Sequence, residues 1–423
     1  MDIDSISSIP AQTQLALSQI QLNADMARRS TSPVPHDLQS LPTSTKETQD
    51  LWYYPPDIAH DLDNIDLPER FKEEVYACAW EYSRCVIPYY SNWRRYVAFM
   101  RTIVIGIVAE FRGDLVDVTA SNNVLNYDLD DLLSTLLGDS PGGVEIAREF
   151  RTFCLMTSTK TGSNRNCELF KRYMNVLTAS PKLWFRLRDC DSLARFTLVV
   201  ALRCNDLDIW FSNEQFEILA EIGDILYDAI AYHKHRSEGE THSTFQYVPN
   251  DMRVEAFRYY REVLWAFDTA WAGQPELAHV TNFLRAFGGP IHMTMRRYRF
   301  VEDSLGICQP ETAEVINKAR QNSKLWCRIE ARRSVDDDVE GYRSLLISDD
   351  KVLFTGLAEL LETYGNYRCT RCQYPKSYGV QSPHEFGGVK LCDECVATWR
   401  EYVMSFPTRL SKAFPEVGFK TTS

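Results

Sequence analysis

The sequence predicts an all-α protein that consists of one large helical domain and a small four-cysteine module near the C-terminus. From residue 51 onward, apolar residues recur at intervals of three and four, which is the spacing of helices with one buried face. Sustained alternation of apolar and polar residues, the pattern of a half-buried strand, does not occur before the C-terminal segment. Two C-x2-C pairs in that segment have the spacing of a zinc site.

The composition argues against several classes of protein. With 423 residues, 44% of them hydrophobic and 25% charged, the chain is long enough for one large domain or two ordinary ones. A net charge of −12 argues against a nucleic-acid partner or an anionic membrane surface. The longest strongly apolar run, Ile103–Ala109, is too short to span a bilayer, and the acidic first residues do not resemble a signal peptide. We therefore expect a cytoplasmic protein whose cysteines outside the cluster are reduced.

Three segments follow from the distribution of aromatic residues and cysteines. Residues 1–50 are polar and contain no aromatic side chain, so they cannot bury enough apolar surface to offset the entropy of ordering. We expect these residues to form a disordered leader. The aromatic run that starts at Trp52 opens an all-α domain over residues 51–365, which would carry any catalytic site. Residues 366–423 form the four-cysteine module, packed on the helical body.

Apolar periodicity and turn residues set the expected helices in order along the chain. They are expected at about Pro68–Cys85, Trp93–Phe111, Leu129–Leu137, Val144–Thr157, Cys167–Leu177, Lys182–Cys204, Asn213–Arg236, Met252–Trp271, Glu276–Ala286, His292–Asp303, Glu311–Ala331 and Val352–Tyr364.

The helix expected over Asn213–Arg236 carries an unusual acidic stripe. Ser212 has the residue type and position of an N-cap. The stripe consists of Glu217, Glu221, Asp224 and Asp228, whose spacing of four, three and four residues places all of them on one face. No Lys or Arg lies between Arg203 and Lys234, so nothing local offsets the repulsion. The stripe is either a solvated face or a site for a cation, and Mg²⁺ suits a few carboxylates that share it with substrate phosphates.

A second acidic group follows the apolar helix expected over Trp93–Phe111. Glu110, Asp114 and Asp117 are spaced by four and three residues, so they share a face if the helix persists that far. The alternative is an ordinary buried helix whose polar end emerges into water.

Two arginine clusters could bind an anion near these carboxylates. One cluster consists of Arg186, Arg188 and Arg195, and the other consists of Arg296, Arg297, Tyr298 and Arg299. Arginine is the preferred residue for bidentate phosphate contacts. Carboxylates, arginines and a helical scaffold together suit the ionisation of an allylic diphosphate, in which metal ions and arginines stabilise the departing anion. The 21 Phe, 21 Tyr and 9 Trp could line the cavity that the resulting carbocation needs.

At this point the sequence resembles a known family, the fungal α-ionylideneethane synthases of abscisic acid biosynthesis. The words that carry the resemblance are WYYPPDIAHDL (Trp52–Leu62), WEYSRCVIPYYSNWRRYVAFMRT (Trp80–Thr102), NDLDIWF (Asn205–Phe211), EIGDILYDAIAYHKHRSEGETHSTF (Glu221–Phe245), FGGPIHMTMRRYRFVED (Phe287–Asp303) and FGGVKLC (Phe386–Cys392). The resemblance implies a lyase, a sesquiterpene synthase with a bundle similar to class I terpene synthases. It also implies that the substrate is farnesyl diphosphate, that the products are (2Z,4E)-α-ionylideneethane and pyrophosphate, and that Mg²⁺ is required.

The chain departs from the metal-binding motifs of ordinary class I enzymes. DDxxD is absent, and in the stretch matching NDxxSxxKE the residues Tyr227, Ala231 and His235 replace the usual ligands. Asp228, Lys234 and Glu240 do fit the motif and the Gly-acid pair that follows it, and Lys234 is a candidate diphosphate ligand.

The candidate Mg²⁺ ligands are consequently drawn from the acidic stripe. They are Asp224 and Asp228, assisted by Glu221, with Glu110 and Asp114 as further candidate catalytic carboxylates. Arg297-Tyr298 is similar to the Arg-Tyr pair that meets diphosphate in class I enzymes, and joins Arg186 and Arg188 as candidate diphosphate ligands. Asp206 and Asp208 remain rival metal ligands, with turn chemistry before Ser212 as their alternative role.

The C-terminal cysteines are the strongest local motif in the chain. Cys369, Cys372, Cys392 and Cys395 form C-x2-C-x19-C-x2-C, which is within the spacing of a zinc site. Four thiolates fill the coordination sphere of Zn²⁺, so we expect a structural role for this metal. Soft thiolates do not select Mg²⁺, so the two metal sites are distinct.

Two other interpretations stay open beside the lyase. A prenyltransferase would ionise the same isoprenoid diphosphate and pass the cation to an acceptor. A non-enzymatic helical scaffold with a zinc module would leave the acidic stripe solvated. A hydrocarbon formed from the diphosphate alone separates the lyase from both.

Overall fold

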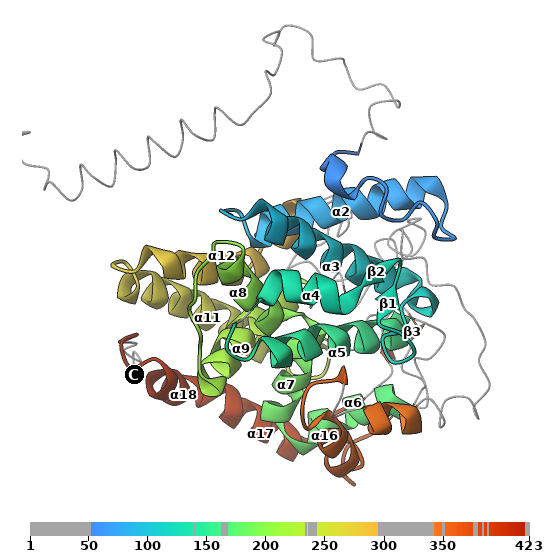
Figure 1. Ribbon diagram of the computed structural model, residues 1–423. Coiled ribbons are helices and arrows are strands. Elements are labelled where there is room, and N and C mark those ends of the chain that lie inside the picture. The colour runs from blue at the N-terminus through green and yellow to red at the C-terminus, as the bar shows by residue number, and fades with distance from the viewer. Residues whose placement is uncertain are drawn as a thin grey trace, which may run out of the picture. The chain divides into compact units, whose positions relative to one another are not determined.

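The computed structural model describes residues 52–138, 140–161, 168–232, 235, 243–294, 342–348, 352–374, 380–382, 385–386 and 389–418 (Figure 1). In chain order the elements are η2 (Pro56–Ile58), α2 (Glu69–Val86), α3 (Trp93–Phe111), η3 (Gly113–Leu115), β1 (Asn123–Val124), β2 (Tyr127–Asp128), α4 (Leu129–Leu137), α5 (Gly143–Thr161), α6 (Glu168–Ala179), α7 (Pro181–Asp191), α8 (Ala194–Arg203), α9 (Asn213–Ile230), η4 (Thr244–Gln246), α11 (Asn250–Ala270), η5 (Pro275–Leu277), α12 (Ala278–Phe287), α13 (Pro290–Thr294), α16 (Leu357–Thr363), β3 (Val380–Ser382), β4 (Glu385–Phe386), α17 (Asp393–Met404) and α18 (Phe406–Ala413). The all-α prediction is confirmed. The expected leader and the helix expected over Glu311–Ala331 lie outside the described residues.

The helical body is assembled around α3, α8 and α9. α3 packs against α2, α4 and α5, α8 packs against α12, and α9 packs against α7 and α11. The N-terminus of α3 is capped by Asn92, whose side chain accepts a hydrogen bond from the Arg95 N–H at 3.1 Å. α3 and α4 begin and end where the apolar pattern predicts. None of the described helices is both long and apolar enough to cross a membrane.

The prediction of a single helix over Lys182–Cys204 is wrong, because this segment forms two helices, α7 and α8. Leu193 adopts a left-handed conformation, with φ of 59°. The carboxylate of Asp189 accepts the backbone N–H of Arg195 at 2.9 Å and so satisfies a free donor in the first turn of α8. This break turns the chain between two helices that both carry arginines of the first cluster.

α9 begins as expected and ends earlier. Ser212 and Gln215 form a capping box at its N-terminus. The helix ends at Ile230, and the prediction that it continues to Arg236 is wrong, since Ala231 is its C-cap. One face of α9 packs on α7 and another packs on α11 and α12, which leaves little of the helix exposed.

α3 ends after Glu110, the first residue of the second acidic group. It stops at Phe111, and Asp114 lies in the short helix η3. A Cβ atom on Gly113 would come within 2.5 Å of the Ser158 carbonyl oxygen, so the chain can pass α5 there only with glycine. The helix does not persist to Asp114 and Asp117, so the condition under which these residues and Glu110 would share one helix face is not met.

The C-terminal region contains elements that the apolar pattern does not predict. α17 begins with Asp393 and Glu394, which interact favourably with a helix N-terminus, and α18 has a proline in its first turn. α16 starts only after Gly356, whose φ is 89°, and so begins later than the predicted Val352. Strands β3 and β4 form a short antiparallel hairpin between the two cysteine pairs. The predicted four-cysteine module is thus partly helical.

Candidate functional site

The inner part of the acidic stripe on α9 is buried. Glu221, Asp224 and Asp228 are 1%, 0% and 0% exposed, which excludes a solvated face for these three side chains. Only Glu217, at the outer end, is partly exposed, and it pairs with Lys182 at 3.0 Å. Carboxylates in this position need partners from other elements, because burying an unpaired charge is costly. The partners differ from one residue to the next.

Arg188 on α7 is the centre of the first site. Its guanidinium contacts Asp228 at 2.7 Å and Asp191 at 2.6 Å, and all three side chains are buried. The second oxygen of Asp228 accepts the backbone N–H of Thr244 at 2.8 Å. Burial opposes the charge of Arg188, but Asp228, Tyr173 and the other nearby acidic groups hold its pKa well above the usual value. Arg188, a member of the first arginine cluster, therefore carries a permanent positive charge beside Asp228.

Asp224 lies in the same site without a matching partner. Neither of its carboxylate oxygens accepts a hydrogen bond of ordinary geometry from the described residues. Burial raises the pKa of Asp224 well above its usual value, although Arg188 and the Ser192 hydroxyl act in the opposite direction. We name Arg188, Asp191, Asp224 and Asp228 the Arg188 site. Three carboxylates and one guanidinium leave two negative charges uncompensated when all are ionised.

The Arg188 site is rich in carboxylates, but among the described residues only the four cysteines lie close enough together to form a group of metal ligands. A buried carboxylate whose two oxygens lack hydrogen bonds has acceptor capacity for a metal ion or a proton. The excess of two negative charges equals the charge of Mg²⁺, and hard oxygen ligands are those that Mg²⁺ prefers. The Tyr173 hydroxyl is buried and has no hydrogen-bond partner of ordinary geometry among the described residues, and burial raises its pKa, so it stays neutral.

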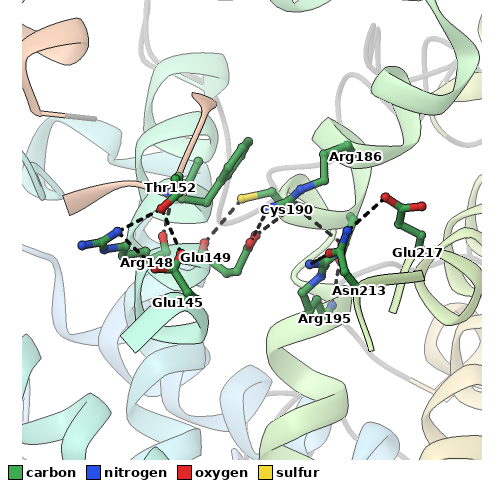
Figure 2. Close-up of polar contacts among 12 residues, drawn as sticks. Glu145, Arg148, Glu149, Thr152, Arg186, Cys190, Arg195, Asn213 and Glu217 are labelled. Carbon is green, nitrogen blue, oxygen red and sulfur yellow. Dashed lines mark hydrogen bonds and ion pairs between the residues drawn. The ribbon is translucent and has the colours of Figure 1, made fainter. Parts of the chain in front are cut away.

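A second network joins α5, α7, α8 and α9, and Figure 2 shows its course. Arg186 forms a bidentate ion pair with Glu149 on α5. Arg195 binds Asp189 at 2.9 Å and Asn213 at 2.9 Å, and Asn213 is the first residue of α9. Arg186, a candidate diphosphate ligand, is thus already paired with a carboxylate. This ion pair connects α5 with α7, the helix that also carries Arg188.

The rival metal ligands Asp206 and Asp208 lie elsewhere, on the turn before α9. Asp206 contacts Arg95 at 2.5 Å, and Asp208 pairs with Arg203 at 3.4 Å. Asp206 has a φ of 55°, which a short polar side chain tolerates, so the expectation of turn chemistry agrees with the structure. Neither residue contacts a described residue of the Arg188 site through a hydrogen bond or ion pair.

The remaining predicted site residues fall into two groups. Asp114 pairs with Arg112 at 3.0 Å and is largely exposed, whereas Glu110 lies in the last turn of α3. Lys234, Arg297 and Tyr298 lie outside the described residues, so their placement stays a prediction.

Tyr227, which stands where class I enzymes have a metal-binding Asn, lies in an aromatic group instead. Its ring is 4.6 Å from that of His292 and 5.6 Å from that of His235, measured between centroids. Phe287 on α12 completes this group at 5.5 Å. Tyr227 directly precedes Asp228 on α9, and neighbouring residues of a helix point in different directions, so the aromatic group and the acidic stripe lie on different faces of the helix.

The four cysteines converge as their spacing predicts. Their sulfur atoms all lie within 4.8 Å of one another, with 3.9 Å between Cys369 and Cys392 and 3.6 Å between Cys372 and Cys395. A tetrahedron with Zn–S bonds of about 2.3 Å has S–S edges of about 3.8 Å, so this arrangement fits Zn²⁺. The backbone N–H of Arg371 contributes most to lowering the pKa of the Cys369 thiol to about 7, whereas burial raises the pKa of Cys372 and Cys395.

Several residues of these sites were not singled out from the sequence. Asp189 and Asp191 stand directly beside the arginines of RLRDCDS, and the i,i+3 spacing of Arg188 and Asp191 is a signal that could have identified the pair. Glu149, Tyr173 and Thr244 come from separate elements, and no local pattern connects them to the stripe.

Comparisons with known proteins agree with the resemblance seen in the sequence. A family model described as Alpha-ionylideneethane synthase aba3 matches residues 50–416. The chain is 54% identical to Alpha-ionylideneethane synthase aba3 of Botryotinia fuckeliana strain B05.10, over 94% of this chain and 92% of that relative. It is 53% identical to Alpha-ionylideneethane synthase abl3 of Leptosphaeria maculans, over 88% of this chain and 87% of the relative. For the abl3 protein of Pyricularia oryzae the identity is 49%, with 88% and 84% covered.

Proposed function

The chain belongs to the Alpha-ionylideneethane synthase aba3 family, and on that premise we propose that it is a lyase that converts farnesyl diphosphate to (2Z,4E)-α-ionylideneethane and pyrophosphate. The observation that carries the proposed chemistry is the Arg188 site, in which Asp224 is fully buried and lacks hydrogen bonds from described residues. An unpaired acid at the centre of a helical body is costly for folding alone, so a functional cation is the physical reason to keep it.

In the proposed reaction the C1–O bond of the diphosphate breaks, and its electron pair leaves with pyrophosphate. The allylic cation cyclises and rearranges, and loss of one proton gives a C15H24 hydrocarbon. Asp224 and Asp228 would hold Mg²⁺, with Asp191 nearby to share the charge. When bound, Mg²⁺ would link these carboxylates to the diphosphate and offset the negative charge that develops on the leaving group.

The chain's own residues contribute position and charge. The two carboxylates that Arg188 binds hold its guanidinium at a fixed place between α7 and α9. A charge fixed before the reaction needs no reorganisation when the leaving group becomes more negative. Asp224 and Asp228 are fully buried, so their carboxylates are shielded from bulk water.

We also propose that the second metal, at Cys369, Cys372, Cys392 and Cys395, is a structural Zn²⁺. The fit of the sulfur–sulfur distances to a closed tetrahedron supports this assignment. The site belongs to the proposed module over residues 366–423, and the all-α catalytic domain extends over residues 51–365. Four thiolates leave no open position for substrate, so this metal takes no part in the ionisation step.

The test is turnover of farnesyl diphosphate by the purified full-length chain, with and without Mg²⁺. Gas chromatography and mass spectrometry of a solvent extract should show a Mg²⁺-dependent C15 hydrocarbon that matches α-ionylideneethane. A different C15 hydrocarbon would reject the product and retain the reaction class. No hydrocarbon without an added acceptor would favour the prenyltransferase, and no diphosphate cleavage in either assay would reject the enzyme. Folded, zinc-loaded protein is the required starting material, checked by circular dichroism and metal analysis.

A further inference from the structure

Glu221 lies one helical turn before Asp224 but has no remaining acceptor capacity. Arg409 on α18 binds both of its oxygens, at 2.6 and 2.8 Å. Tyr260 on α11 donates to one oxygen at 2.6 Å, and Tyr402 on α17 donates to the other at 2.9 Å. We name Glu221, Tyr260, Tyr402 and Arg409 the Glu221 clamp. Because this carboxylate is fully hydrogen-bonded, we infer that Glu221 positions α9 and does not bind a metal ion.

The two C-terminal members of the clamp are attached to the cysteine cluster by helix α17. Cys392 is the N-cap of α17, and Cys395 lies in its first turn. Tyr402 lies seven residues, or about two helical turns, further along the same helix. Ser405 links α17 directly to α18, where its side chain accepts a hydrogen bond from Arg409 at 3.1 Å. Any metal ion held by the cysteines therefore fixes the start of the segment that delivers Tyr402 and Arg409.

α17 also packs on the helix that carries Arg188. The indole N–H of Trp399 donates to the Leu177 carbonyl on α6 at 2.9 Å. The ring of Phe185 on α7 is 5.7 Å from that of Trp399 and stacks on Tyr402 at 5.9 Å. Arg188 lies on α7 three residues beyond Phe185. α17 therefore contacts α7 through Phe185 and contacts α9 through the hydrogen bond from Tyr402 to Glu221, and these are the two helices that form the Arg188 site.

We propose that the C-terminal module is a positioning element for the Arg188 site, in which metal binding at the four cysteines fixes α17 and α18, and Arg409 and Tyr402 then hold α9 through Glu221. Arg409 and Tyr402 are positioning residues in this proposal, because they act on Asp224 through Glu221 and α9. The effect on turnover rests on the proposed function, whereas the effect on the mobility of α9 can be measured independently of it.

The first experiment compares Arg409→Gln with Arg409→Lys and with Arg400→Gln. Arg400 is the matched control, since it lies on α17 and forms an exposed ion pair with Asp251. Misplacement of a reacting group by about 1 Å can cost about 100-fold in rate, so we expect Arg409→Gln to lower kcat by about that factor. We also expect it to raise the Mg²⁺ concentration needed for half-maximal turnover. Arg409→Lys should recover part of the loss because it keeps the charge but not the bidentate contact, and Arg400→Gln should match the wild type.

A merely structural role would lower the folded fraction and leave the kcat and Mg²⁺ requirement of the folded enzyme unchanged. Rates are therefore normalised to folded, zinc-loaded protein, measured by circular dichroism and mass-spectrometric metal analysis. Unchanged kcat and Mg²⁺ dependence in folded Arg409→Gln would overturn the proposal. If that variant does not fold, Tyr402→Phe replaces it, since it removes one hydrogen bond and keeps the ring that stacks on Phe185. A several-fold loss of kcat at unchanged zinc content supports the proposal, and no loss overturns it.

The second experiment measures the metal dependence without using turnover. Amide hydrogen exchange is followed on peptides from Asn213–Ile230 in zinc-loaded protein, in protein treated with a zinc chelator and in Cys395→Ser. We expect faster exchange of α9 after zinc loss, with peptides from α3 unchanged as an internal control. Unchanged exchange in α9 would overturn the proposal. If the wild type makes no hydrocarbon but α9 responds to zinc, the proposed function fails and the positioning role stands.

Discussion

The Arg188 site and the Glu221 clamp use neighbouring turns of α9 in opposite ways. In the clamp, one buried carboxylate has four hydrogen bonds from three side chains. In the Arg188 site, the guanidinium pairs with Asp191 and Asp228, and Asp224 accepts no ordinary hydrogen bond from the described residues. A buried carboxylate with all its hydrogen bonds formed is compatible with a stable fold. A buried carboxylate without hydrogen bonds lowers the stability of the fold, and its oxygens remain able to bind a ligand. The difference separates Glu221, whose hydrogen bonds are satisfied, from Asp224, for which the proposed function assigns a role in binding a cation.

Removal of Arg188 should have the largest effect on stability. Arg188→Gln leaves Asp191 and Asp228 buried without their cation, so the free energy of unfolding should fall by about 3–5 kcal/mol. Diphosphate cleavage should fall below detection in the same variant. Urea unfolding measures the first effect, with Arg148→Gln as the control because Arg148 forms an exposed pair with Glu145. A loss no larger than that of the control would show that the buried pairs contribute little.

Neutralisation of Glu221 should have the next largest effect. Glu221→Gln keeps the size of the side chain but leaves the guanidinium of Arg409 without its counter-ion. Since hydrogen bonds to charged groups contribute about 1.5–3 kcal/mol, we expect the free energy of unfolding to fall by about that amount. Denaturant unfolding at constant zinc concentration measures it. A variant as stable as the wild type would remove the distinction between the clamp and the Arg188 site.

Substitution of Asp224 should raise the free energy of unfolding, in contrast to the substitutions of Arg188 and Glu221. Asp224→Asn removes an acid whose ionisation is opposed by burial, so we expect the free energy of unfolding to rise by about 0.5–2 kcal/mol, the range of single stabilising substitutions. The change should at the same time abolish Mg²⁺-dependent turnover. Thermal unfolding without Mg²⁺ measures the gain, and a loss of stability would contradict the assignment of Asp224 as an unsatisfied acid.

The pH dependence of stability provides a related test. Burial raises the pKa of Asp224 in the folded protein, so its contribution to stability is full below the pKa of the unfolded state, about 3.9, and is lost as the pH rises through the raised pKa. Asp224→Asn should therefore lose less stability than the wild type as the pH rises above about 4. Urea unfolding across this range, without Mg²⁺, makes the comparison. Addition of Mg²⁺ should stabilise the wild type and leave the variant unchanged.

The smallest effect is expected at the exposed end of the stripe. Glu217 pairs with Lys182, whose side chain is mostly exposed, so Glu217→Gln should change the free energy of unfolding by about 0–1 kcal/mol. The effect should disappear at high salt. A loss as large as that of Glu221→Gln would show that position on the helix, rather than burial, decides the energetics.

Much of the fold follows from local patterns in the sequence. The apolar runs of α3 and α4 set the bounds of both helices, and the spacing of the cysteines identifies a cluster that the structure brings together. The break at Leu193 could not be predicted in this way, because no Gly or Pro marks it and the side chain of Asp189 satisfies the freed N–H. The Glu221 clamp could not be predicted from local patterns either, because Arg409 and Glu221 are 188 residues apart in sequence. Local patterns predict helices and short metal motifs, whereas the pairing of buried charges depends on tertiary packing.

The long separation between Glu221 and Arg409 also bears on the order of events during synthesis. α9 leaves the ribosome well before α18, so the carboxylate of Glu221 must stay in water, or protonated, until the last part of the chain has been made. Contacts that are so distant in sequence are slow to form, because the loop between them must close first. The centre of the helical body therefore reaches its final state only when one of the last helices to be translated binds to it.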